Sequence, residues 1–190
     1  MQTRAASAPA LTTIPTPLGK MVAAATDRGV CLLEFNDRPA LPRERADLEA
    51  ILGGPLSPGE HEHLALLRHE LDAYFRGELR AFTVPLWTPG TEFQQRVWRR
   101  LLEIPYGETI SYDKVAADIG SIGGQRAVGR ANGQNRIAIV VPCHRVIEKS
   151  GALRGYGGGR HRKEFLLDLE RGRSGTGTRW DGARGATAQP

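Results

Sequence analysis

Residues 111–133 have the sequence SYDKVAADIGSIGGQRAVGRANG, and this stretch decides which class of fold the chain can adopt. Its pattern predicts two short helices, Ser111 to Ile119 and Gln125 to Asn132, joined by a turn at Gly120 to Gly124. Ser111 is a residue type that caps helix N-termini. Two short helices joined by a glycine-bearing turn are typical of a helix-turn-helix.

The second of these helices has an unusual composition. Ala127, Gly129 and Ala131 leave it slim, whereas Arg126 and Arg130 project from it. Glycine costs helix stability, so its presence indicates close approach to another surface. That surface is either a nucleic-acid groove or a neighbouring helix, and the composition favours neither.

Upstream of this motif, strand and helix patterns alternate. Apolar runs at Met21 to Ala25 and Val30 to Phe35 flank Asp27-Arg28-Gly29, which predicts a β-hairpin. A short polar helix is expected around Glu44 to Leu52, and a longer helix over Glu60 to Phe75. The apolar stripe of the longer helix consists of Leu64, Leu67, Leu71 and Tyr74.

The second half of the chain begins with a helix signal. Thr91 and Gln94 fit a capping box, and the helix that follows is expected to bury Phe93, Val97, Trp98 and Leu101. Further on, the apolar run Ile137 to Val141 predicts a buried strand. A glycine-rich loop, Lys149 to Gly159, and a last helix, Lys163 to Glu170, complete this half.

Composition and charge restrict the class of protein. A net charge of +5 fits a polyanionic partner, although a generally basic proteome gives the same value. No run of 18 apolar residues exists, and Met1 to Ala10 lack an apolar signal segment, so we expect a cytoplasmic protein with no membrane span. Residues 1–16 and 172–190 are expected to be disordered.

The chain contains two cysteines, Cys31 and Cys143, which excludes a disulfide scaffold and suits a reducing compartment. Cys31 lies within an apolar run and is interpreted as a small buried thiol. His61, His63 and His69 are interpreted as solvated side chains rather than a zinc site, because His61 and His63 point to different faces of a helix. No metal site is predicted.

Cys143 is the candidate nucleophile, because His144 and Arg145 follow it and a neighbouring base or cation activates a thiol. Adjacent side chains on an extended strand face opposite ways, so contact between the two requires a bend or an intervening water. Pro142 fixes the backbone just before the thiol. Glu170 is a candidate for the carboxylate that orients His144.

Several ordered motifs around Cys143 resemble the O6-alkylguanine-DNA alkyltransferases, also called methylated-DNA–protein-cysteine methyltransferases. The resemblance runs from about Pro85 to Glu170, and it is looser over residues 17–35 and 64–85. The motifs are Pro142-Cys143-His144-Arg145-Val146, Gly90-Thr91-Glu92-Phe93-Gln94, Val97-Trp98, Ile104-Pro105-Tyr106-Gly107-Glu108-Thr109, Ser111-Tyr112, Arg126-Ala127-Val128-Gly129-Arg130-Ala131 and Asn135.

The resemblance implies an α/β (α+β) fold in two parts. Residues 17–84 would form a small ribonuclease-H-like α/β domain, residues 85–90 a linker, and residues 91–171 a mainly helical domain with a winged helix-turn-helix. The implied function is DNA repair by direct reversal: one irreversible transfer of an alkyl group from O6-alkylguanine, or less efficiently O4-alkylthymine, to the protein. The implied partner is double-stranded DNA, bound through its minor groove with the damaged base flipped out of the helix. The protein would act as a monomer associated with the nucleoid, and it would need no cofactor.

The family pattern also implies roles for individual residues. Cys143 would be the nucleophile, His144 would take its proton through a water, Glu170 would orient His144, and Asn135 would brace the active-site turn. Arg126 would fill the gap left by the flipped base, and Tyr112 would crowd its 3′ phosphate and contact the base. The remaining candidates are the pocket-lining Val146, Tyr156 and Gly157 and the backbone-contacting Gln94, Asp113, Ser121 and Lys149.

Two positions depart from the pattern. Arg136 stands where many relatives have proline, which adds a positive charge near the site. Gly157 stands where some relatives have serine, which would open the pocket and predicts tolerance of adducts larger than methyl.

Three rival functions remain. A methylation-responsive regulator of this family would carry a four-cysteine metal domain, a lesion sensor would lack the cysteine, and an unrelated Cys-His hydrolase would turn over without DNA.

Overall fold

An antiparallel meander forms the N-terminal sheet in the computed structural model, which describes residues 8–153 and 155–172. Its strands are β1 (Ala10–Thr16), β2 (Gly19–Thr26) and β3 (Gly29–Phe35). A two-residue strand, β4 (Ser57–Pro58), pairs in parallel with β1, which gives the strand order β3-β2-β1-β4. The predicted hairpin is confirmed as β2 and β3.

The prediction that residues 1–16 are disordered is wrong for Ala10–Thr16. These residues form β1, which pairs along its whole length with β2 and buries Ile14. The strand has the sequence ALTTIPT, without a regular alternation of apolar and polar residues, and it is stabilised by its pairing with β2 rather than by its own composition. Residues 1–7 and the tail 173–190 lie outside the described residues.

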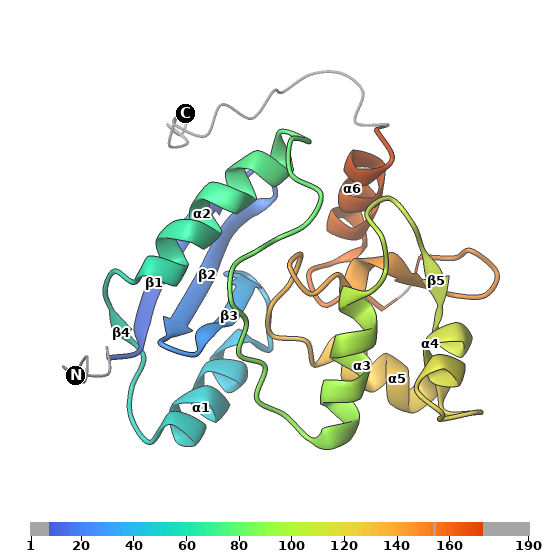
Figure 1. The fold of residues 1–190 in the computed structure, drawn as a ribbon, viewed down its shortest axis with the longest axis horizontal. Helices are drawn as coiled ribbons and strands as arrows, with labels where there is room; N and C mark the ends of the chain where they lie inside the picture. The colour runs from blue at the N-terminus through green and yellow to red at the C-terminus, as the bar shows by residue number, and fades with distance from the viewer. Residues whose placement is uncertain (1–7, 154, 173–190) are drawn as a thin grey trace, which may run out of the picture.

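Two helices cover the two faces of this sheet (Figure 1). α2 (Glu62–Phe75) packs against β1, β2 and β3, and the side chains of its predicted stripe are all buried. α1 (Leu41–Leu52) packs against β3 on the other face and ends at Gly53, whose φ is 71°. Cys31 is buried, as predicted, and it packs in the cluster that α1 covers. It has no register partner on β2, because the register between β2 and β3 shifts there at a bulge.

His61 departs from the prediction of a solvated side chain. It is only 8% exposed because it caps α2: its Nδ1 accepts a hydrogen bond from the backbone N of His63 at 3.1 Å. Its Nε2 lies 3.3 Å from Oδ1 of Asp27. His69 is exposed, as expected.

The segment Pro85 to Gly90 connects the two halves and is held against β3 (Figure 1). The backbone N of Val30 donates to Pro85 O at 2.8 Å, and the N of Trp87 donates to Val30 O at 2.9 Å. A Cβ at Gly29, whose φ is 131°, would lie 2.5 Å from Pro85 O. Glycine at this turn therefore allows the close approach of the connecting segment.

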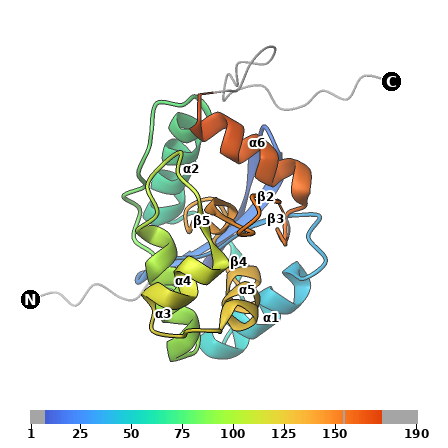
Figure 2. The same cartoon turned by 90° about the vertical axis from the view of Figure 1, so that its right-hand side faces the viewer.

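The C-terminal part is mainly helical (Figure 2). Its helices are α3 (Glu92–Leu102), α4 (Tyr112–Asp118), α5 (Gln125–Gly133) and α6 (Arg160–Glu170), with a 3₁₀ turn η1 (Cys143–Arg145). Two short strands, β5 (Ile110–Ser111) and β6 (Val146–Ile147), pair in parallel. The capping box of Thr91 and Gln94 is confirmed, and Ser111 caps α4 by accepting from the N of Lys114.

One buried core joins the two parts. Leu33 of β3 receives a hydrogen bond from the backbone N of Ala138 at 2.8 Å, and its own N donates to Arg136 O at the same distance. Around this bridge, apolar side chains from the sheet, α3, α4 and α5 form a continuous cluster. The expected class, a sheet domain followed by a helical part, is confirmed. None of the helices in residues 8–153 and 155–172 is long and apolar enough to cross a membrane.

Candidate active site

The segment before Cys143 is a buried turn, so the predicted strand over Ile137 to Val141 is wrong. Ile137 forms a bridge to Leu33, and the chain then turns back, with the N of Val141 donating to Ile137 O at 3.0 Å. Ile139 has a φ of 71°, a conformation that strains a β-branched residue by about 1–3 kcal/mol. A continuous apolar run indicates burial, and burial alone does not separate a strand from a turn.

Asn135 spans this turn. Its Oδ1 accepts a hydrogen bond from the N of Ile137 at 3.0 Å, and its Nδ2 donates to Val141 O at 2.9 Å. The same Nδ2 lies 3.1 Å from Sγ of Cys143. Asn132 on α5 adds a bond from its Nδ2 to Cys143 O at 3.3 Å. Two asparagines therefore tie the cysteine to the end of α5, and sequence reasoning singled out only Asn135.

Cys143 is a buried thiol, 7% exposed. Burial raises its pKa to about 11, against a smaller lowering effect of the Asn135 amide. At neutral pH the resting group is therefore the protonated thiol, which is a poor nucleophile until a base takes its proton. A reaction at this thiol would therefore need a base close to it.

His144 is fully buried beside Cys143 in the 3₁₀ turn. Its Nε2 lies 2.7 Å from Oε1 of Glu170, whereas its Nδ1 has no hydrogen-bond partner among the described residues. Burial lowers the pKa of His144, against the raising effect of Glu170, so the ring is neutral at neutral pH. Contact with Glu170 fixes the proton on Nε2 and leaves Nδ1 as the basic nitrogen.

The Glu170 carboxylate is contacted by donors from four residues in three segments: η1, the loop at Gly107 and α2. Arg145 donates through Nε to Oε2 at 2.8 Å and through Nη2 to Oε1 at 2.9 Å, and the N of Gly107 donates to Oε2 at 3.1 Å. The hydroxyl of Tyr74 donates to Oε1 at 2.7 Å. Burial alone would raise the pKa of Glu170, but the bonds from His144 and Arg145 outweigh it and hold that pKa well below its usual value.

Tyr74 and Arg145 are residues of this cluster that sequence reasoning did not assign to the site. Tyr74 belongs to the apolar stripe of α2, so it was interpreted as core. Arg145 was visible only as the cation after His144. Neither sequence position indicates that both side chains meet one carboxylate at the end of α6.

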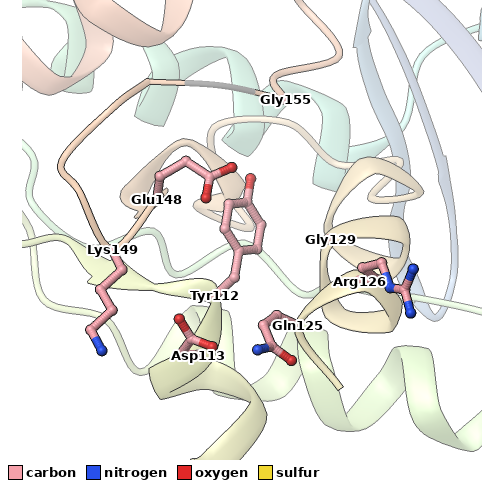
Figure 3. A pocket seen from close by; sticks show the side chains of 8 residues that line it. All are labelled: Tyr112, Asp113, Gln125, Arg126, Gly129, Glu148, Lys149 and Gly155. Carbon is pink, nitrogen blue, oxygen red and sulfur yellow. The ribbon is translucent and has the colours of Figure 1, made fainter. Parts of the chain in front are cut away.

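A cavity of about 430 Å³ lies between α4, α5 and the loop after β6. Four of the predicted residues line it, namely Tyr112, Asp113, Arg126 and Lys149, together with Gln125, Gly129, Glu148 and Gly155. Figure 3 shows Tyr112 reaching toward Gly155 while Arg126 points outward from α5. A Cβ on Gly155 would lie 3.4 Å from the Tyr112 hydroxyl.

Of the small residues of α5, Gly129 lines this cavity, Ala127 lines a neighbouring hollow with Arg130, and Ala131 is buried in the core. A Cβ at Gly129 would lie 3.9 Å from the ring of Tyr112, which is ordinary contact, so glycine is not forced there by a neighbouring helix. Val128 is buried in the core as well. This arrangement favours the first of the two explanations for the slim helix, an open surface that another molecule approaches.

Gln94 and Ser121 lie away from this cavity. Gln94 donates through Nε2 to Oε1 of Gln134 at 3.0 Å and lines a neighbouring hollow with Arg126 and Arg130. Ser121 lies in the turn between α4 and α5, where its Oγ would meet a Cβ on Gly124 at 2.3 Å. These two predicted contacts are therefore not part of the same cavity.

Val146 begins β6, and Tyr156 and Gly157 lie in the loop that precedes α6. Val146 is fully buried, and the Tyr156 hydroxyl is buried with no partner among the described residues. A Cβ on Gly157 would lie 2.6 Å from Cζ of Arg38. The guanidinium fills the space that a serine side chain would take, so the expectation that Gly157 opens the pocket for larger adducts loses its basis.

Arg38 is a further residue that sequence reasoning missed. It pairs with Glu34 and, at 3.0 Å, with Glu44, and its Nη2 donates to Gly133 O at the end of α5 at 2.6 Å. Arg136, expected near the site, instead donates through Nη1 to Pro89 O at 3.1 Å. It thus holds the connecting segment rather than the thiol.

The fold and the site together define a class of protein: a helix-turn-helix protein with a buried cysteine held between asparagines and a histidine–glutamate pair. Residues 11–88 match the ribonuclease-like domain of 6-O-methylguanine DNA methyltransferase, and residues 92–172 match the DNA-binding domain of the same family. The chain belongs to the 6-O-methylguanine DNA methyltransferase family.

Individual relatives agree with this assignment. A methylated-DNA–protein-cysteine methyltransferase of Mycobacterium tuberculosis is 62% identical over 105 residues, which are 55% of this chain and 64% of that protein. The constitutive enzyme of Bacillus subtilis is 40% identical over 164 residues, covering 84% and 94% of the two chains. The matched segment thus spans less than two thirds of the mycobacterial protein and nearly all of the Bacillus protein.

Solved structures give the same result. The Mycobacterium tuberculosis OGT in complex with DNA superposes with a TM-score of 0.75 at 45% identity, covering 86% of this chain and 94% of that one. The O6-methylguanine-DNA methyltransferase of Pyrococcus kodakaraensis gives a TM-score of 0.56 at 26% identity, covering 86% and 99%.

Proposed function

We propose that this protein repairs DNA by transferring a methyl or other alkyl group from O6 of guanine to Sγ of Cys143, with O4-alkylthymine as a poorer substrate. One arrangement carries the proposal. The buried, protonated thiol of Cys143 is followed in the chain by the neutral His144, whose Nε2 is held by Glu170. These residues belong to the part of the chain that contains the helix-turn-helix. Family membership supports the same chemistry.

The transfer is a single displacement. The thiol proton passes through a bridging water to Nδ1 of His144, the buried nitrogen that has no hydrogen-bond partner among the described residues. The sulfur then forms a bond to the alkyl carbon as the bond from that carbon to O6 breaks. The electron pair of the broken bond stays on guanine, which takes up a proton and is restored.

Glu170 and Asn135 support this displacement without touching the alkyl group. Glu170 stays ionised and stabilises the imidazolium that forms on His144. The Asn135 amide, 3.1 Å from Sγ, favours the developing thiolate, because a hydrogen bond to the charged form stabilises it. The product is a thioether, which water does not hydrolyse, so each molecule acts once and the step requires no metal or organic cofactor.

Duplex DNA is the proposed partner, approached through the minor groove by α5. Arg126 and Arg130 are exposed on this helix, and no carboxylate of the described residues forms an ion pair with either. The damaged base would rotate out of the stack into the cavity that Tyr112 and Gly155 line, and Arg126 would occupy its place. Asp113 and Lys149 at the rim, with Gln94 and Ser121 nearby, would contact the backbone.

We extend the proposal to the remaining expectations. Residues 17–84 and 91–171 would be the two domains on either side of the segment 85–90, with β1 added to the first of them and one core shared between them. The protein would work as a monomer in the cytoplasm.

Intact-mass spectrometry tests the proposed function. The full chain is incubated with duplex DNA containing O6-methylguanine, and we expect a gain of one methyl group located on the peptide with Cys143. Cys143→Ala should gain none, whereas Cys31→Ala should gain as much as the wild type, because Cys31 is buried in the N-terminal domain. DNA binding without a mass change would favour a lesion sensor, and DNA-independent turnover would favour a hydrolase.

A further inference from the structure

The hydroxyl of Tyr74 crosses from the N-terminal sheet domain to the catalytic cluster of the helical part. Tyr74 lies on α2, is fully buried, and donates to Oε1 of Glu170 at 2.7 Å. The same oxygen lies 2.7 Å from Nε2 of His144. One carboxylate oxygen thus joins a side chain of the sheet domain to the histidine beside the thiol.

Three aromatic rings hold the phenol of Tyr74 in place. Phe75 and Tyr106 contact it edge-on, with centroids at 5.4 and 6.0 Å, and Phe82 lies tilted at 5.3 Å. Burial and the adjacent Glu170 charge raise the pKa of Tyr74 well above its usual value, so the hydroxyl keeps its proton and acts as the donor. Its geometry leaves the phenol one role, which is to donate to Glu170.

We propose that Tyr74 is a positioning residue for the transfer reaction, fixing through Glu170 the orientation of His144. The inference rests on the proposed function and assigns a specific task to the sheet domain. Without the hydroxyl, Oε1 would keep donors from His144 and Arg145 only. The carboxylate would then lose one of the bonds that fix its orientation, and the oxygen that faces the imidazole would carry more negative charge.

The effect on His144 has a definite sign. A less neutralised carboxylate stabilises the imidazolium, so the pKa of His144 rises when the hydroxyl is removed. A protonated His144 cannot accept the thiol proton, and the acid limb of the reaction therefore moves to higher pH. Besides Tyr74, the titratable or charged groups around His144 and Glu170 are Arg145, Lys163, Tyr106 and Cys143.

The test compares Tyr74→Phe with the wild type over a range of about pH 5.5 to 9. Two rates are measured: methyl transfer from O6-methylguanine DNA, and alkylation of Cys143 by iodoacetamide without DNA, read from the mass of its peptide. We expect both rates to fall by about tenfold above the acid limb, because His144 is less well oriented, and both acid limbs to shift upward by about half to one pH unit.

Tyr106→Phe is the matched control. Tyr106 contacts Tyr74 and is half-buried, and no hydrogen bond of its hydroxyl exists among the described residues, so both profiles should match the wild type. In a Glu170→Gln background, Tyr74→Phe should produce no further shift, because the hydroxyl acts through that carboxylate.

The outcomes separate the two proposals. A wild-type protein that takes no methyl group from DNA would defeat the proposed function, while the iodoacetamide profile would still test Tyr74. A Tyr74→Phe variant with a lower melting temperature but unchanged acid limbs would show that the hydroxyl is only structural, and the inference would be overturned.

Discussion

In the proposed reaction, Cys143 accepts the alkyl group and His144 accepts the proton of the thiol. The pKa of the thiol is raised to about 11 by burial, so the cysteine alone is inert near neutral pH. In the proposed mechanism the neutral His144 is the base, and its Nδ1, which has no hydrogen-bond partner among the described residues, receives the proton. This differs from cysteines that rest as thiolates beside a cation, and it makes activity depend on the histidine.

His144→Gln should therefore lower the rate of methyl transfer by about 10²-fold or more, since general-base catalysis contributes factors of that size. Single-turnover mixing with methylated DNA measures it. Raising the pH should recover part of the lost rate in this variant, because hydroxide replaces the missing base. A rate within threefold of the wild type at neutral pH would contradict the assignment of His144.

Gly157 is sensitive to any added side chain. A Cβ there would lie 2.6 Å from the Arg38 guanidinium, which Glu34, Glu44 and Gly133 O hold in place. We expect Gly157→Ala to lower the free energy of unfolding by about 1–3 kcal/mol, as overpacking does. Urea unfolding measures it. The control Gly54→Ala, with nothing within 4 Å of the new methyl, should stay within about 0.5 kcal/mol of the wild type.

α5 serves two functions that can be separated. Its buried side carries Asn132, which holds the backbone of Cys143, and its exposed side carries Arg126 and Arg130. We expect Arg126→Ala to reduce methyl transfer from duplex DNA by at least tenfold and to leave alkylation of Cys143 by iodoacetamide unchanged. An equal loss in both reactions would mean that Arg126 acts on the thiol and not on DNA.

Elements with local sequence signals could be predicted, whereas elements that are stabilised by distant parts of the chain could not. The helices with an apolar stripe or a capping box, α2 and α3, were predictable because their signals are local. β1 and the turn at Ile139 were not, because one is stabilised by β2 and the other by β3 and Asn135. Cys143 and its neighbours followed from the motifs, whereas the bond from Tyr74 to Glu170 depends on how two parts of the chain pack together.

The two parts of the molecule share charged contacts as well as a core. Arg38 joins Glu34 of β3 to the end of α5, and Arg162 of α6 donates through Nη1 and Nη2 to Asp37 at 2.9 and 2.8 Å. Tyr74 joins α2 to Glu170. Because these links and the core all cross between the parts, we expect the described residues to unfold in one cooperative transition.

The buried acid Glu34 should make stability depend on pH. Burial raises its pKa to about 7, partly offset by Arg38. Between an unfolded pKa of about 4.3 and this value the folded state binds the proton more strongly, so Glu34 removes stability as the pH rises. Glu34→Gln should therefore gain stability relative to the wild type between about pH 5 and 8, measured by urea unfolding. Parallel curves for the two proteins would contradict the buried acid.

The central claim, a single alkyl transfer to Cys143, is tested most directly by counting. Duplex DNA carrying radiolabelled O6-methylguanine is added in increasing excess, and label bound to protein is measured after digestion. We predict a plateau at one methyl group per molecule, held in the peptide that contains Cys143, with guanine restored in the DNA. Label released to solvent, label on another residue, or continued turnover beyond one equivalent would contradict it.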